Sequence, residues 1–177
     1  MNKILSILAF SAAVAFGANP VAVLETTQGK IELELYPNVA PKAVENFTTH
    51  IKEGYYNHLT FHRIIKGFMI QGGDPTGTGR GGESIWHKEF ADEIKPGYDF
   101  DHPGVLAMAN HGENTNGSQF FITTGAASWL NGNYTIFGHI IGSTDALKKL
   151  NAVQTTGQYG GDKPLQRQEI IKAYIKK

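Results

Sequence analysis

Short strand-like runs separated by glycine-bearing loops are the feature that most restricts how this chain can fold. Apolar and polar residues alternate through residues 20–36 on both sides of a glycine-containing turn, which predicts a β-hairpin. The closing segment from residue 169 alternates again, and further short runs lie at 60–65, 69–72, 104–108, 119–124 and 135–141. The 21 glycines, many of them near Asp, Asn or Thr, favour strands joined by turns over long helices.

Two segments, far apart in the chain, have the periodicity of helices. From Pro41, which suits a first helical turn, Val44, Phe47 and Ile51 fall on one helical face, and Gly54 ends the pattern. A second short helix is expected within residues 143–153, with Ser143 or Thr144 as its cap. Many short strands with only two helices predict an all-β dominated fold, a closed antiparallel barrel. No repeat or linker divides residues 19–177, which we interpret as one domain.

Residues 1–18 form a separate unit with the pattern of a secretory signal peptide. One lysine precedes an apolar run that ends in small residues, with cleavage expected near residues 17 and 18. The run is too short to span a bilayer comfortably, and the alternative is a buried first helix. The absence of cysteine excludes a lipid-anchored bacterial precursor and disulfide bonds. We therefore expect a soluble protein of the bacterial periplasm, with release to the exterior as the open alternative.

Several other classes of site have little support in the sequence. The 16 basic and 16 acidic residues occur in short runs, without the basic excess typical of nucleic-acid binding. The glycine pattern at 77–82 lacks the following helix of a dinucleotide site. His58 and His62 have the spacing of helical zinc ligands but lie on a turn and a strand, so we favour a structural role for them.

A single arginine interrupts the apolar stretch at 61–72 and raises a specific question about its role. A three-residue loop at 66–68 would place Arg63 opposite Gln71 and Ile65 opposite Met69. Side chains alternate along strands, so Arg63, Met69 and Gln71 would share one face and line a pocket. The alternative is that Arg63 only pairs with a surface carboxylate from an edge strand.

Three long motifs, "FHRIIKGFMIQGGD", "MANHGENTNGSQFFIT" and "SWLNGNYTIFG", closely resemble the cyclophilin family of peptidyl-prolyl isomerases. The resemblance runs from about residue 21 to residue 174 and implies an eight-stranded antiparallel barrel capped by two helices. It implies that Arg63 is the essential catalytic arginine. The residues that match the proline-ring pocket are Phe68, Met69, Phe121 and Leu130. The residues that match those holding the peptide backbone are Gln71, Ala109, Asn110 and Gln119, with Asn110 acting through its main chain.

Two aromatic positions bear on ligand preference in the same resemblance. Trp129 matches a tryptophan beside the pocket that contacts cyclosporin in the family, and Tyr134 stands where the best-known members have histidine. The implied substrates are proline-containing polypeptides, and the implied protein is a monomer without stable membrane insertion. No cofactor is expected, because rotation about an amide makes and breaks no bond to carbon. A binding module that captures proline segments without catalysis is the rival interpretation.

Overall fold

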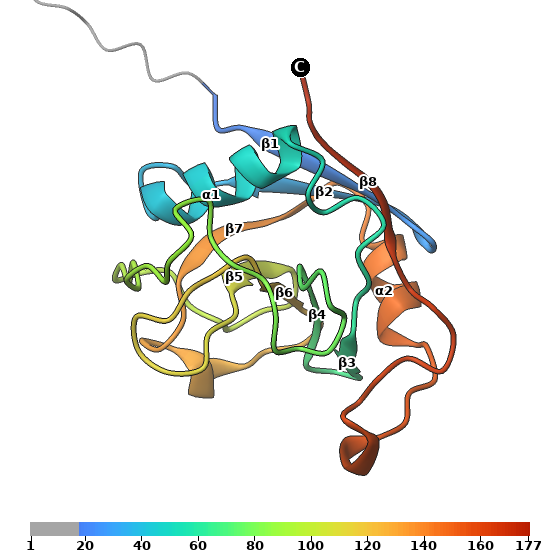
Figure 1. The fold of residues 1–177 in the computed structure, drawn as a ribbon. Helices are drawn as coiled ribbons and strands as arrows, with labels where there is room; N and C mark the ends of the chain where they lie inside the picture. Colours follow the sequence, from blue (N-terminus) through green and yellow to red (C-terminus); the bar gives the residue numbers. More distant parts are fainter. Residues whose placement is uncertain (1–17) are drawn as a thin grey trace, which may run out of the picture.

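The computed structural model describes residues 18–177, so the expected signal peptide lies outside the described residues except for Ala18. This part of the chain contains eight strands and two α-helices (Figure 1). The strands are β1 (Val21–Thr26), β2 (Gly29–Leu35), β3 (Arg63–Ile65), β4 (Met69–Gly72), β5 (Val105–Met108), β6 (Phe120–Thr123), β7 (Ile136–Ile141) and β8 (Ile170–Ile175). The helices are α1 (Pro41–Lys52) and α2 (Asp145–Asn151), and 3₁₀ turns lie at Ser128–Leu130 and Gln158–Gly160. The all-β dominated class and both helices are confirmed, although the expected strand at 60–65 begins only at Arg63.

The prediction of a closed barrel was wrong, because the eight strands form an open sheet. Their order is β3-β4-β6-β5-β7-β2-β1-β8, with antiparallel pairing throughout. Strand β3 has three residues, and the amide of Ile64 on it donates to the carbonyl of Asp162, which belongs to a loop (3.0 Å). On the side of β8, the segment before β3 forms an isolated bridge, Thr60 to Glu169, and a few backbone hydrogen bonds such as Phe61 N to the carbonyl of Gln168 (2.9 Å), but no continuous ladder with β3. The loop thus occupies the place where a closing ladder would run.

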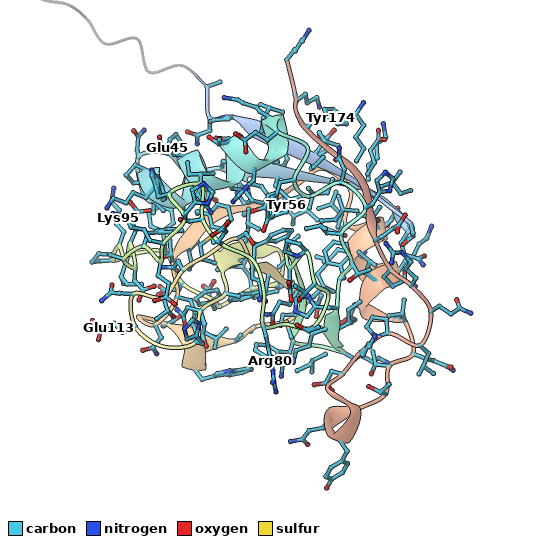
Figure 2. The ribbon with its side chains drawn as sticks, in the orientation of Figure 1. Glu45, Tyr56, Arg80, Lys95, Glu113 and Tyr174 are labelled. Carbon is cyan, nitrogen blue, oxygen red and sulfur yellow. The ribbon has the colours of Figure 1, made fainter. Side chains whose placement is uncertain are left out.

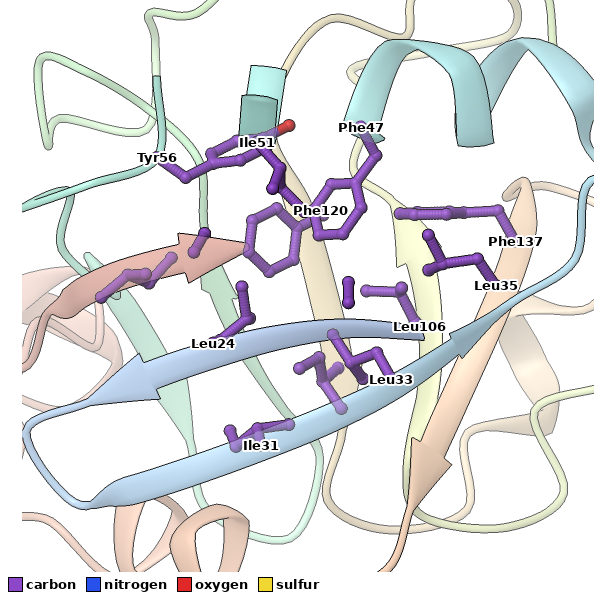
Figure 3. Packing of buried hydrophobic residues seen from close by; sticks show 14 of the residues in the cluster. Leu24, Ile31, Leu33, Leu35, Phe47, Ile51, Tyr56, Leu106, Phe120 and Phe137 are labelled. Atoms are coloured by element: carbon purple, nitrogen blue, oxygen red, sulfur yellow. The ribbon is translucent and has the colours of Figure 1, made fainter. Parts of the chain in front are cut away.

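The helix α1 covers the interior with the apolar face that its sequence predicts. Val44, Phe47 and Ile51 are buried, and Figure 3 shows Phe47 beside Phe120 and Phe137. The Phe47 ring lies edge-on to the rings of Phe120 and Phe137, with centroids 5.1 and 5.2 Å apart. Aromatic pairs in this geometry add about 0.5–1.5 kcal/mol each beyond the burial of their area. The helix is therefore fixed to the sheet by ring packing as well as by aliphatic contact.

Strand alternation divides the buried residues into two clusters. Ile64 and Ile70 join the larger cluster beneath α1, whereas Met69 joins a smaller one that contains Phe100 and Phe121. In Figure 2 the buried Tyr56 lies inside the molecule, while charged side chains surround it at the surface. The hairpin of β3 and β4 consequently faces the main core on one side and the smaller cluster on the other.

The two ends of the described chain meet on the sheet. Strands β1 and β8 pair antiparallel, with Ala22 opposite Ile175, and the amide of Lys176 donates to the carbonyl of Val21 at 2.8 Å. Figure 1 shows both ends leaving the same side of the molecule. Within residues 18–177, no helix has the length and apolarity needed to cross a membrane.

Candidate active site

The β3–β4 hairpin has the register that the sequence predicts. Arg63 pairs with Gln71 and Ile65 with Met69, on either side of a turn in which the amide of Phe68 donates to the carbonyl of Ile65 (3.0 Å). Gly67 in this turn has a φ of 75°, in the left-handed region that glycine adopts at little cost. The turn therefore fixes the face on which Arg63 lies.

A cavity of about 170 Å³ lies on that face. Its lining contains nine of the eleven predicted site residues, namely Arg63, Phe68, Met69, Gln71, Ala109, Asn110, Phe121, Leu130 and Tyr134. Sites for drug-sized ligands have volumes of roughly 300–1,000 Å³. The cavity is thus of a size for one small ring or side chain.

The floor of the cavity is apolar and built on aromatic packing. Met69, Phe121 and Leu130 are buried. Phe121 stacks on Phe100 with ring centroids 5.8 Å apart, and the ring of Tyr134 meets Phe121 edge-on at 5.6 Å. Phe100 was missed at the sequence level, because it lies in an irregular loop where no periodicity reports burial. Its stacking supports Phe121, and its amide donates to Asn131 Oδ1 (2.9 Å).

The other two predicted site residues lie around the cavity rather than in its lining. Trp129 remains 66% exposed, and its ring packs on Phe68 with centroids 5.4 Å apart. Gln119 accepts a hydrogen bond from Gln71 Nε2 at its Oε1 (2.8 Å) and donates from Nε2 to the carbonyl of Gly81 (2.8 Å). Trp129 thus borders the rim, and Gln119 orients Gln71.

The backbone near Asn110 continues the polar side of the site. The amide of Ala109 donates to the carbonyl of Gln119 (2.9 Å), and Asn110 Nδ2 donates to the carbonyl of Asn133 (2.9 Å). The side chain of Asn110 is therefore used to tie two loops together. Its expected main-chain role toward a peptide stays a prediction.

Arg63 is both paired and facing the cavity, so each of the two interpretations of this residue holds in part. Its Nε lies 3.6 Å from Asp162 Oδ2, while 44% of the arginine side chain stays exposed. At the same time Arg63 lines the cavity beside Met69 and Gln71. Since a guanidinium has five N–H donors, one ion pair leaves donors for a ligand.

A second cavity, of about 500 Å³, adjoins the first at Gln71, Ala109 and Asn110. Its other wall includes the glycine-rich loop at 77–82, which wraps around the buried carboxylate of Asp74. This carboxylate accepts hydrogen bonds from the amides of Thr76 (2.8 Å) and Gly79 (2.6 Å), among others. Burial acts to raise the pKa of Asp74, but these hydrogen bonds outweigh it and the pKa is lowered. The glycines therefore shape a wall around a fixed anion.

His62 directly precedes β3 and does not line the cavity beside Arg63. It is buried, and neither ring nitrogen has a hydrogen-bond partner among the described residues. Burial lowers the pKa of His62, with a smaller opposing effect from Asp74. Across residues 18–177, no group of three or more His, Cys, Asp or Glu side chains is placed to hold a metal ion.

Comparison with known proteins gives one consistent family. Residues 21–175 match the family model described as cyclophilin type peptidyl-prolyl cis-trans isomerase/CLD. The human peptidyl-prolyl cis-trans isomerase-like 1 is 52% identical over 155 residues, 88% of this chain and 92% of the human protein. Peptidyl-prolyl cis-trans isomerase 9 of Schizosaccharomyces pombe is 53% identical over 154 residues, 87% of this chain but only 25% of the yeast protein.

Solved structures agree with the sequence comparisons. A crystal structure of a Cryptosporidium parvum cyclophilin type peptidyl-prolyl cis-trans isomerase has a TM-score of 0.86 at 42% identity, covering 90% of this chain and 98% of that one. A second crystal structure of that protein, in the presence of the dipeptide Ala-Pro, has a TM-score of 0.85. The relatives named here are eukaryotic, so they lend no support to a bacterial source.

Proposed function

The chain belongs to the cyclophilin-type peptidyl-prolyl cis–trans isomerases, and from this premise we propose that it uses Arg63 to accelerate X–Pro rotation in exported polypeptides. The observation that carries the proposal is the position of Arg63. A permanent cation lines a small cavity that has an apolar floor, beside the polar side chain of Gln71. A site that only bound apolar rings would not require a charge there.

The chemistry follows from the electronic structure of the amide. Conjugation gives the X–Pro bond a rotational barrier of about 18–20 kcal/mol. When the amide twists, the prolyl nitrogen regains its lone pair and becomes a hydrogen-bond acceptor. Arg63 donates to this nitrogen in the twisted form and has no equivalent acceptor in the planar forms. Such selective binding of the transition state is what raises the rate.

The cavity supplies the second requirement, a fixed ring. Met69, Phe121 and Leu130 hold the proline ring, and the polar groups near Gln71 and Asn110 hold the preceding backbone. One side of the bond is thus immobilised while the other rotates. The apolar floor also lowers the local dielectric constant, which strengthens the interaction of Arg63 with the amide.

The proposal that the substrates are exported polypeptides rests on residues 1–18 alone. Their signal-peptide pattern supports export to a periplasm, where slow X–Pro isomerisation limits the folding of newly translocated chains. In this proposal the mature protein is a monomer, and cyclosporin competes for the cavity, with an affinity set in part by Tyr134. Cell fractionation with and without residues 1–18 tests the export part.

A protease-coupled isomerisation assay on an Ala-Pro tetrapeptide, with and without cyclosporin, tests the catalytic part. We expect acceleration that is proportional to the protein concentration and reduced by the drug. Exchange NMR on the same peptide distinguishes the rival. Binding shifts without faster cis–trans exchange would indicate a binding module and refute catalysis.

A further inference from the structure

The loop of residues 155–165 makes contact with the arginine of the site. Asp162 in this loop is 13% exposed at its side chain, and its Oδ2 lies 3.6 Å from Arg63 Nε. Its carbonyl accepts the amide hydrogen of Ile64, the residue next to Arg63, at 3.0 Å. One loop residue therefore contacts β3 twice, once through its backbone and once through its charge.

The loop is built to hold Asp162 in place. The amide of Asp162 donates to the carbonyl of Gly157 (2.9 Å), and Thr155 forms an isolated bridge with Pro164. Thr156 Oγ1 donates to the carbonyl of Gly160 (2.8 Å). These hydrogen bonds close the loop on itself, and its 3₁₀ turn at Gln158–Gly160 projects away from the body in Figure 1.

The backbone of Asp162 is unusual for a residue with a side chain. Its φ is 55°, in the left-handed region that glycine adopts at the lowest energetic cost and that Asp and Asn adopt more readily than other residues with a side chain. Gly160 and Gly161 directly precede it, yet the position itself carries a carboxylate. A residue kept in a less favoured conformation, facing a site, is a reason to look for a role of its side chain.

We propose that Asp162 is a positioning residue, whose carboxylate holds the Arg63 guanidinium by its Nε edge so that the remaining N–H donors point to the substrate amide. Arg63 is otherwise a long side chain on a three-residue edge strand, free to move among rotamers in solvent. An ion pair at Nε restricts these rotamers. The inference rests on the proposed function. It adds to that function a reason why the Arg63 side chain keeps one orientation toward the substrate.

The test compares Asp162→Asn with the wild-type protein and with Glu45→Gln. Asparagine keeps the shape and tolerates the left-handed backbone, but it removes the charge. Glu45→Gln removes one negative charge from an exposed position of α1 and serves as the matched control. For Asp162→Asn we expect kcat/KM to fall about two- to fivefold, as for the loss of one partly exposed ion pair. The fall should lie in kcat, with the peptide Kd nearly unchanged, and Glu45→Gln should behave as wild type.

A double-mutant cycle separates positioning from damage to the fold. In an Arg63→Ala background, Asp162→Asn should cause no further loss of exchange rate, because no guanidinium remains to be positioned. Protection of the Ile64 amide against hydrogen exchange should persist, because the backbone contact does not need the charge. An equal loss of rate in both backgrounds would overturn the proposal, since it would indicate a structural effect of the loop.

A side-chain NMR measurement decides the question without reference to turnover. The Nε–Hε order parameter of Arg63 should fall in Asp162→Asn and stay at the wild-type value in Glu45→Gln. An unchanged order parameter would refute positioning even if activity fell. Absence of isomerase activity in the wild-type protein would instead remove the proposed function, while this order parameter would still decide whether Asp162 holds Arg63.

Discussion

Replacing Arg63 with alanine separates a catalytic role from a structural one, because the residue contributes little to the fold. Its side chain is 44% exposed, and its ion pair is made with a residue of a surface loop. Exposed ion pairs contribute about 0–1 kcal/mol to stability, and in a domain of this size ~1 kcal/mol corresponds to roughly 2–4 °C in Tm. We therefore expect the Tm of Arg63→Ala to fall by no more than about 4 °C.

The expected loss of activity is much larger. A hydrogen bond from a charged donor contributes ~1.5–3 kcal/mol, and each 1.36 kcal/mol corresponds to a factor of ten in rate. Loss of the guanidinium should thus lower kcat/KM by roughly ten- to 150-fold. Lysine should rescue only part of this loss, because its ammonium lacks the planar fork of donors.

The measurement is the protease-coupled assay, repeated by exchange NMR so that the protease is not itself the readout. Arg167→Ala is a suitable control, because it removes another partly exposed guanidinium that pairs with Glu169 and does not line the cavity. We expect the control to keep wild-type turnover. Near-wild-type turnover in Arg63→Ala would refute the mechanism, and a Tm loss well above 4 °C would refute the stability argument.

Three further predictions concern the supports of the site. Asp74→Asn should lower the free energy of unfolding by about 1–3 kcal/mol at pH 7. The pKa of Asp74 in the folded protein is lowered from 3.8, so its contribution to the free energy of unfolding is present above pH 3.8 and is lost as the pH falls through the folded pKa. The free energy of unfolding should therefore fall less steeply on acidification in the variant than in the wild-type protein. In the wild-type protein, burial lowers the pKa of His62, so below pH 6.5 the unfolded chain takes up a proton before the folded protein does and the free energy of unfolding falls. His62→Phe should make this fall with decreasing pH less steep. Chemical denaturation at several pH values measures it, and the same dependence of the free energy of unfolding on pH in both proteins would contradict the prediction. Gly125→Ala should lower the Tm by several degrees and reduce turnover. A Cβ at this position would lie 2.2 Å from the carbonyl oxygen of Gly67, in the hairpin that carries Arg63, so the hairpin would have to shift. A Tm equal to that of the wild-type protein would contradict this prediction.

Local sequence signals were sufficient for the parts of the fold that are regular. The glycine at position 67 and the alternation on either side of it predicted the pairing of Arg63 with Gln71. In β6 the same alternation puts Phe120 in the main core and Phe121 in the wall of the cavity. Side chains alternate between the two faces of a strand, so once a turn fixes the pairing of two strands, it also fixes which residues face the core.

The features of the fold that the sequence did not predict depend on irregular loops, in which apolar and polar residues follow no regular pattern. The closed barrel was predicted from the number of short strands, but the edge of β3 is covered by the loop around Asp162, whose sequence reads only as turns. Phe100 likewise lies in a loop, between two aspartates, and only the three-dimensional structure brings it against Phe121. Contacts between a loop and a distant strand leave no local pattern for sequence reasoning to detect.

Within residues 18–177, the meeting of the two ends of the described chain on β1 and β8 has a practical consequence. Since Ala22 lies opposite Ile175, a short peptide bridge would join the ends without crossing the cavity. The fold is therefore suited to circular permutation, with new ends opened in an exposed turn such as that at Gly97. For the same reason it can be inserted into a host protein as a self-contained cassette, because its entry and exit points require almost no separation in the host.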